Sequence, residues 1–276
     1  MMAAVIDDIH LDHVAVAMEH RGLGWPRYVR DLPGEWLGGG GTAGFWSEQI
    51  QYANGMKVEL LHPADVESND FLRRFLDRNG PGPHHLTFKV KDIGAALAEA
   101  EAAGYPPVGV NLENPGWQEA FLHPKSAPGI VVQLAQSSYD DDDDDWGTPE
   151  SPDLPAPRTT EHATLVRVTH AVASLDTGTP LFVDLLAGEE LDRGKDEDGS
   201  WIDLAWPGPG RIRLVEPSSP ASPVATWLGD RAGRLLHLEF TTHAPEDVPD
   251  ATRNSDGTFT VAPEDNLGVR LLLREG

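Results

Sequence analysis

The chain has 276 residues, of which 39% are hydrophobic and 24% charged, a composition typical of globular proteins with a substantial apolar core. Acidic residues number 45 against 21 basic ones, and the resulting net charge of −24 argues against binding to a nucleic-acid backbone. We find no apolar run of about 18 residues that would span a membrane. The N-terminus has no signal-peptide pattern, so we expect a cytoplasmic protein. Cysteine is absent, which excludes thiolate metal sites and leaves the 11 histidines as the candidates for metal chemistry.

A run of six aspartates at positions 140–145 divides the sequence, and several prolines follow it. Like charges repel one another and proline interrupts helices and sheets, so we predict an acidic, proline-rich linker over residues 139–160. The linker separates a first domain, residues 1–138, from a second domain, residues 161–276. Two domains also agree with the usual domain size of about 100–200 residues.

The first domain contains two similar units in chain order. The first unit has an alternating strand over residues 9–18, a helix within 25–33 and two strands over 44–63 that turn at Asn54-Gly55, a strong hairpin signal. The second unit has a strand over 84–90, a helix over 92–103 and further strands over 118–136. Asp92 is placed to cap this helix and Gly104 to end it.

The second domain repeats the plan. Its segments 165–175, 210–217, 234–242 and 267–275 match the segments 9–18, 56–63, 83–90 and 128–136, in that order. Internal repetition of this kind indicates four βαβββ units arranged in two domains. The predicted fold class is α+β.

Side chains alternate between the two faces of a strand, and in the first domain this alternation separates apolar residues from residues that can bind a metal. One face of each strand is apolar, and the other face carries His13, Glu59, His85 or Gln133. These four side chains would converge if the strands curl into one cup. Two imidazoles, a carboxylate and an amide oxygen suit one divalent ion, such as Zn, Ni, Co, Fe, Mn or Mg.

Several segments resemble the vicinal oxygen chelate superfamily, which includes glyoxalase I, methylmalonyl-CoA epimerase and the extradiol dioxygenases. The first strand, LDHVAVAM, resembles that of the superfamily. The segments KVELLHP, GPGPHHLTFKVKDI and LHPKSAPGIVVQL are similar to the epimerase branch in particular. The resemblance covers residues 9–136 well, and residues 165–274 as a pattern only.

The resemblance implies that the paired units of each domain form a curved, cup-like mixed β-sheet with flanking helices. It also implies a metal at the centre of the cup, held by His13, Glu59, His85 and Gln133. The family pattern has a carboxylate on the last strand, where this chain has Gln133, and its usual catalytic bases have no clear counterparts here. Glu48 and Glu59 are therefore the candidate bases. We expect four further residues to contact substrate: His123 and Lys125 in the turn before the last strand, and Trp46 and Trp117 in the cavity wall.

The second domain lacks an equivalent set of ligands. Matching the repeats by sequence places His170, Arg213, His237 and Leu272 at the four positions, and arginine and leucine offer no donor to a cation. We predict no metal in this domain. An ion pair between Arg213 and Glu239 would replace the metal, and the alternative is a pocket in which arginines bind an anion.

These observations favour a metal-dependent isomerase, epimerase or lyase that acts on a small carbonyl or acyl-CoA-like substrate through an enolate. One alternative is an Fe(II) extradiol-type dioxygenase, which needs two histidines and one carboxylate. Others are a binding protein that sequesters a small molecule and a scaffold without activity. We expect a small-molecule partner and a monomer or homodimer.

Overall fold

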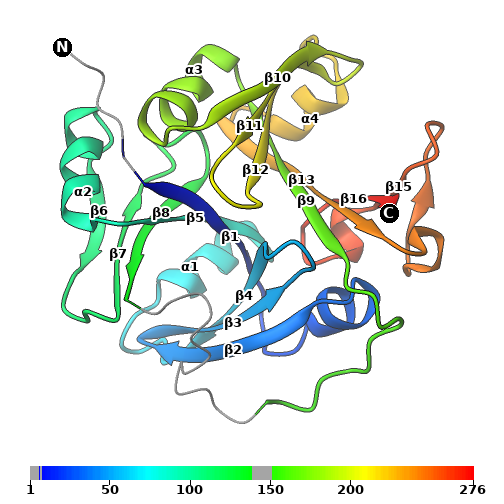
Figure 1. The fold of residues 1–276 in the computed structure, drawn as a ribbon, viewed down its shortest axis with the longest axis horizontal. Helices are drawn as coiled ribbons and strands as arrows, with labels where there is room; N and C mark the ends of the chain where they lie inside the picture. The colour runs from blue at the N-terminus through cyan, green and yellow to red at the C-terminus, as the bar shows by residue number, and fades with distance from the viewer. Residues whose placement is uncertain (1–5, 7, 139–150) are drawn as a thin grey trace. The chain divides into compact units, whose positions relative to one another are not determined.

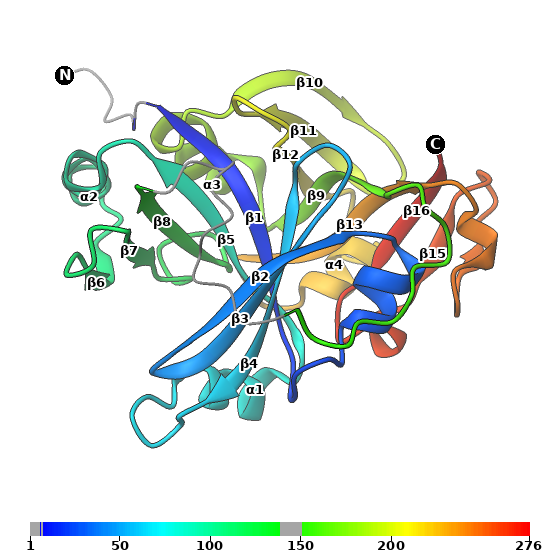
Figure 2. The same cartoon turned by 60° about the horizontal axis from the view of Figure 1, so that its bottom comes forward.

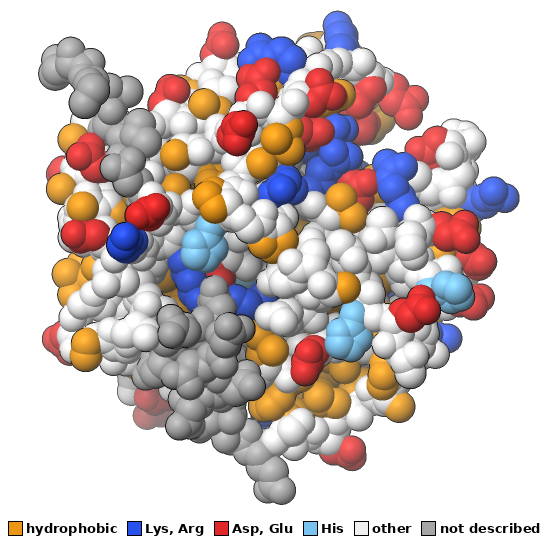
Figure 3. Space-filling model, viewed as in Figure 1, with side chains coloured by type: hydrophobic (Ala, Val, Ile, Leu, Met, Phe, Trp, Pro, Cys, Tyr) orange, Lys and Arg blue, Asp and Glu red, His pale blue; other side chains and the backbone are white. Residues whose placement is uncertain are grey.

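The computed structural model describes residues 6, 8–138 and 151–276, and its architecture is α+β, as predicted (Figure 1). Two eight-stranded mixed sheets carry the fold, one in each half of the sequence. Among the described residues, no helix is both long enough and apolar enough to cross a membrane. Acidic side chains are spread over the face of the molecule drawn in Figure 3, as the net charge of −24 leads us to expect. The predicted acidic run lies outside the described residues, and residues 151–160 contain no helix or strand.

The first sheet has the strand order β2-β3-β4-β1-β5-β8-β7-β6 and curls into a half-barrel cup. Its strands are β1 (Ile9–Ala17), β2 (Glu35–Thr42), β3 (Gly44–Gln51), β4 (Lys57–Ala64), β5 (Gly82–Val90), β6 (Pro107–Asn111), β7 (Trp117–Leu122) and β8 (Val131–Ser137). β1 pairs in parallel with β4, and β5 in parallel with β8, whereas β2–β3, β3–β4, β6–β7 and β7–β8 are antiparallel. The predicted hairpin at Asn54-Gly55 is confirmed, since it joins β3 to β4.

The second sheet repeats the same plan with the order β10-β11-β12-β9-β13-β16-β15-β14. Its strands are β9 (Thr164–Val172), β10 (Glu189–Lys195), β11 (Gly199–Ala205), β12 (Arg211–Pro217), β13 (Gly233–Thr242), β14 (Thr252–Arg253), β15 (Phe259–Val261) and β16 (Leu271–Glu275). Position by position, the order of the first sheet is preserved, so the internal repetition seen in the sequence is a repetition of structure.

Short helices accompany the strands. They are η1 (Pro26–Asp31), α1 (Phe71–Asn79), α2 (Ile93–Ala102), α3 (Leu175–Thr179), η2 (Pro180–Leu185), α4 (Pro223–Leu228), η3 (Pro245–Asp247) and η4 (Pro263–Asp265). The helix predicted within residues 25–33 is present as the π-helix η1.

Helix α1 was not predicted. Leu72 and Leu76, one turn apart, are buried and pack in one apolar cluster with Ala15, Ala17 and Leu61 of β1 and β4. This helix therefore covers one end of the sheet, and Figure 2 shows it beside β4. The small alanines of β1 leave the room that the larger side chains of the helix fill.

Helix α2 lies alongside β6, β7 and β8 (Figure 1). As predicted, Asp92 caps it: the side chain accepts a hydrogen bond of 2.9 Å from the backbone N–H of Ala95. Gly104, with a φ of 86°, follows the end of the helix in a left-handed conformation that glycine adopts without strain.

Replacing Asp92 by alanine should lower the free energy of unfolding by about 1 kcal/mol, the usual cost of losing an N-cap. The reason is that the N–H of Ala95 loses its acceptor at the start of α2. Urea unfolding of Asp92→Ala and of Asp92→Ser measures the difference. Because serine also caps helices, a serine variant as unstable as the alanine variant would contradict this explanation.

The described residues form two compact units, and each unit draws on both halves of the sequence. One contains residues up to 12 together with 85–138 and 167–236. The other contains residues 13–84, 151–166 and 237–276. In the first unit, Phe88 packs edge-on against Trp206, with ring centroids 5.2 Å apart. In the second, Tyr52 packs against Phe240 in the same way at 4.9 Å.

A buried carboxylate of η1 binds the last residues of the predicted linker. Asp31 is 4% exposed and lies beside three arginines: Arg27, Arg30 and Arg158. Arg158 donates to Asp31 Oδ1 at 2.7 Å, and its backbone N–H donates to the carbonyl of Arg30. Ion pairs with more than one cation offset the free-energy cost of removing this carboxylate from water. The contact therefore holds Arg158, which precedes the second sheet in the chain, beside η1.

Candidate metal centre

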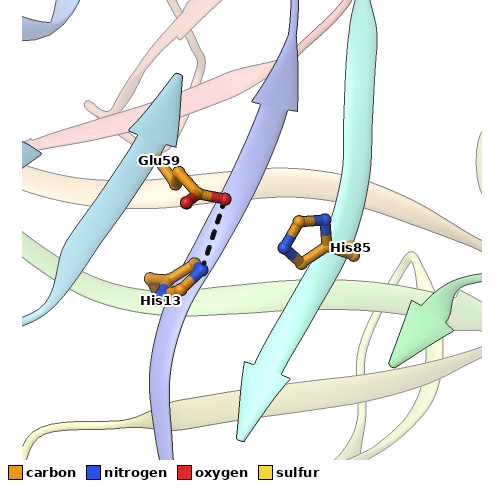
Figure 4. Close-up of side chains that lie close together, drawn as sticks. All are labelled: His13, Glu59 and His85. Carbon is orange, nitrogen blue, oxygen red and sulfur yellow. Dashed lines mark ion pairs between the residues drawn. The ribbon is translucent and has the colours of Figure 1, made fainter. Parts of the chain in front are cut away.

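Three side chains meet on the concave face of the first sheet. His13 comes from β1, Glu59 from β4 and His85 from β5, and the three point toward one another (Figure 4). One ligand atom from each lies within 4.8 Å of the other two, and His13 Nε2 is 3.5 Å from Glu59 Oε2. All three side chains are buried.

The strand registers explain why these residues share a face. In the parallel pair β1–β4, His13 lies opposite Lys57 and Ala15 opposite Glu59, so all four side chains project from the same side. Two imidazoles and one carboxylate, buried and within reach of a common point, fit a divalent ion.

Lys57 is a cup residue that the sequence analysis missed. It is the register partner of His13, it lies two residues before Glu59 on the same face, and it is 8% exposed. A buried ammonium next to a carboxylate offsets that carboxylate's charge, so Lys57 contributes to the electrostatics of the cup. The signal was available, because Lys57 and Glu59 alternate with the apolar Val58 and Leu60.

Gln133 lies on β8 in a chain of hydrogen bonds. It is the register partner of Thr87, whose hydroxyl donates to Gln133 Oε1 at 2.5 Å. Its Nε2 donates to Glu119 Oε2 at 2.6 Å, and Trp117 Nε1 donates to the same oxygen at 2.9 Å. Trp117 thus lies in this network on β7, and Glu119 is a second carboxylate that the sequence analysis did not consider.

His123 and Lys125 lie in the exposed turn after β7. The backbone N–H of Lys125 donates to His123 Nδ1 at 3.1 Å, and the carbonyl of His123 accepts from Ser126 and Ala127. The imidazole of His123 therefore serves the turn itself. The structure does not gather these two residues with the histidine–glutamate group.

Glu48 and Trp46 project from the opposite face of the sheet. In the antiparallel pair β3–β4, Glu48 lies opposite Leu60 and Trp46 opposite His62, whereas Glu59 lies opposite Gln49. Glu48 is fully buried there and accepts hydrogen bonds from Arg21, at 2.9 Å, and from Trp25 Nε1, at 3.2 Å. The structure therefore does not bring Glu48 or Trp46 to the cup.

The same cluster explains the glycine run of β2. A Cβ atom on Gly41 would lie 2.7 Å from the ring of Trp46, and one on Gly39 would lie 2.9 Å from Glu48 Cγ. The glycines leave room for the two side chains that lie across them. Burial lowers the pKa of the neighbouring His62, which favours its neutral form beside Arg21.

The strand register corrects the match proposed for the second sheet. Arg213 lies opposite Thr169, as Glu59 lies opposite Ala15, so the counterpart of His13 is Arg167 and not His170. His170 instead faces Pro128, and its Nε2 donates to that carbonyl at 2.7 Å. The match based on the two histidines therefore misplaced this strand by three residues relative to β1.

Asp203 bridges the two arginines that occupy the His13 and Glu59 positions. Its carboxylate accepts from Arg213, at 2.6 and 2.7 Å, and from Arg167 at 3.1 Å. Glu239, for its part, accepts a hydrogen bond from Arg274 at 2.6 Å. The pairing of Arg213 with Glu239 stays a prediction.

One family model matches the first half of the chain. Residues 13–121 match the model of the Glyoxalase/Bleomycin resistance protein/Dioxygenase superfamily, so this part of the chain is similar to the domains of that superfamily. The matched residues include His13, Glu59 and His85.

Two curated relatives are epimerases. Ethylmalonyl-CoA/methylmalonyl-CoA epimerase of Cereibacter sphaeroides is 40% identical over 88 residues, which cover 29% of this chain and 61% of that protein. The mitochondrial methylmalonyl-CoA epimerase of Homo sapiens is 33% identical over 84 residues, which cover 29% of this chain and 47% of that protein. The chain thus spans less than two thirds of the length of either relative.

A solved structure matches the whole architecture. A mutant of 4-hydroxymandelate synthase from Streptomyces coelicolor aligns with a TM-score of 0.64 over 97% of this chain and 93% of its own. The identity is 13%, so the likeness concerns the fold alone.

Proposed function

We propose that the chain is a metal-dependent enzyme of the isomerase, epimerase or lyase type, acting on a small carbonyl or acyl-CoA-like substrate. The observation that carries the proposal is the buried group of His13, Glu59 and His85 on the concave face of the sheet. The two relatives named as epimerases of acyl-CoA compounds support the substrate class.

The three residues supply different ligand atoms and charges to the proposed metal site. His13 and His85 offer neutral nitrogen ligands, and Glu59 adds one negative charge, so a bound dication leaves the group with a net charge of +1. When bound, such an ion polarises a substrate carbonyl and stabilises the negative charge of an enolate. Lys57, on the same face, adds a further positive charge beside the group.

Epimerisation also requires a group that removes a proton from the carbon next to the carbonyl and a group that returns it. Glu59 is a carboxylate on the concave face and is our candidate for the proton acceptor. Glu48 is no longer a candidate, because its carboxylate lies on the other face and is held by Arg21 and Trp25. Glu59 would take up the proton that leaves the carbon, and epimerisation is complete when a second group delivers a proton to the opposite side of the planar enolate.

Solvent deuterium exchange tests this proposal directly. The metal-loaded protein should incorporate deuterium at the α-carbon of an acyl-CoA substrate, measured by mass spectrometry across a panel of acyl-CoA thioesters. Glu59→Gln should abolish incorporation, while Glu48→Gln should retain it in the molecules that fold. Absence of exchange across the panel would rule out CoA thioesters as substrates.

A second candidate function is an iron-dependent oxygenase. Two histidines and one carboxylate with open positions are the ligand set of non-haem Fe(II) oxygenases. The likeness in fold to a mutant of 4-hydroxymandelate synthase, which extends over 97% of this chain, is in keeping with this candidate. Iron in the purified protein, together with oxygen consumption on a panel of catechols, would favour this candidate over the first.

A further inference from the structure

We propose that Glu119 is a positioning residue that fixes the orientation of the Gln133 amide, so that its carbonyl oxygen, and not its NH₂ group, faces the strand that carries His85. This inference rests on the proposed metal site. It concerns a residue that touches neither the histidines nor the ion, and it acts through Gln133.

The argument begins with the chemistry of an amide. A glutamine side chain ends in one oxygen, which can bind a cation, and one NH₂ group, which cannot. The two ends have nearly the same shape, so packing alone does not choose between the two orientations. A carboxylate at position 133 would offer oxygen in either orientation, whereas Gln133 offers it in only one.

Glu119 distinguishes the two orientations because an ionised carboxylate only accepts hydrogen bonds. Gln133 Nε2 donates to Glu119 Oε2 at 2.6 Å. If the amide were reversed, its oxygen would lie against the carboxylate oxygen, and two acceptors would face each other at the same distance. Thr87 cannot make this choice, since a hydroxyl can donate or accept.

The preferred orientation turns Gln133 Oε1 toward β5. Thr87, whose hydroxyl donates to this oxygen at 2.5 Å, is two residues from His85 and therefore on the same face of the strand. The ring of Phe121, the register partner of Gln133 on β7, packs edge-on against His85 with centroids 6.3 Å apart. The amide oxygen thus keeps one lone pair for Thr87 and a second for a cation.

Glu119 is itself held in place. Trp117 Nε1 donates to the same carboxylate oxygen at 2.9 Å, so Oε2 accepts two hydrogen bonds. Trp117, Glu119 and Gln133 lie on adjacent strands β7 and β8, in one compact unit with Thr87 and His85. Outer partners that orient a ligand commonly account for a 10–100-fold effect on metal affinity.

Cobalt binding tests the inference, with Co²⁺ as the probe and its visible absorption as the readout. The isosteric variant Glu119→Gln can donate as well as accept, so it permits both orientations of Gln133. We expect it to bind Co²⁺ about 10–100-fold more weakly than the unmodified chain. The absorption spectrum should change in the same way as in Gln133→Ala. The double variant should bind no more weakly than Gln133→Ala alone, because Glu119 acts only through Gln133.

Two further variants complete the test. Glu101→Gln removes one negative charge from the exposed side of α2 and should bind Co²⁺ as the unmodified chain does. Trp117→Phe keeps a ring on β7 and removes one of the two donors to Glu119, so it should weaken binding in the same direction and by less. This variant also tests the inference should Glu119→Gln fail to fold.

A metal-independent measurement reports the orientation itself. In the metal-free protein, the side-chain amide protons of Gln133 should show a downfield NMR signal from the bond to the carboxylate, and Glu119→Gln should remove it. Unchanged Co²⁺ affinity in Glu119→Gln, with the unmodified chain binding normally, would overturn this inference and leave the proposed function standing. No Co²⁺ binding by the unmodified chain would overturn both.

Discussion

Replacing His13 by alanine should leave the purified protein without its divalent ion, while the unmodified chain carries about one ion in each molecule, as expected for a site of this ligand set. His13 is fully buried and is one of only three side chains in the histidine–glutamate group found among the described residues. Loss of a direct ligand should cost more than the about 10–100-fold that loss of an outer partner costs. Elemental analysis of protein purified without chelator measures the content.

Thermal unfolding gives a second measurement, which does not depend on how much metal the protein retains through purification. An ion that binds only the folded chain, supplied at about 100 times its Kd, raises the free energy of unfolding by about 2.7 kcal/mol. This increase should be present in the unmodified chain and in the control His20→Ala, whose side chain is exposed, and absent in His13→Ala. Equal stabilisation of His13→Ala would contradict the assignment of His13 as a ligand.

Lowering the pH from about 6.5 to about 4 should reduce the free energy of unfolding by about 3 kcal/mol through His170 alone. His170 is fully buried, and its Nε2 donates to the carbonyl of Pro128, which leaves Nδ1 without a proton. Burial lowers the pKa of His170 from 6.5 in the unfolded chain to about 4 in the folded one. Between these two values the unfolded chain binds a proton that the folded chain does not, so acid favours unfolding.

The variant His170→Gln isolates this effect, because a glutamine amide can still donate to Pro128 and does not titrate. Urea unfolding at a series of pH values should show a smaller loss of stability for His170→Gln than for the unmodified chain. His20→Gln should follow the unmodified chain over the whole range. Parallel curves for His170→Gln and the unmodified chain would show that His170 takes up its proton over the same pH range in both states, which would contradict the lowered pKa in the folded chain.

Strand alternation carried most of what could be predicted from the sequence. The rule that neighbouring side chains point to opposite faces put His13, Glu59 and His85 on the polar face of their strands, and the structure brings these three together. The repeated pattern also predicted the α+β fold and the paired βαβββ units. Both depend only on local spacing, which a sequence displays directly.

Predictions that depended on the register between two strands were less accurate. Glu48 has the same alternation as a cup residue, and only its register with Leu60 shows that it faces away from Glu59. Residue type alone makes His170 the counterpart of His13, whereas the strand register shows that this counterpart is Arg167. Glu119 and Gln133 meet diagonally across β7 and β8, and nothing in either strand alone indicates it.

The division of the compact units has a consequence for how the chain folds on the ribosome. Residues 13–84 complete their unit with residues 237–276, which are synthesised much later. At about 5–20 residues per second, roughly 8–30 s pass between the appearance of residue 84 and that of residue 237. During that time Tyr52 lacks the ring of Phe240 against which it finally packs. We therefore expect the newly made first half to expose apolar side chains, and to benefit from chaperones, until residues 237–276 have been made.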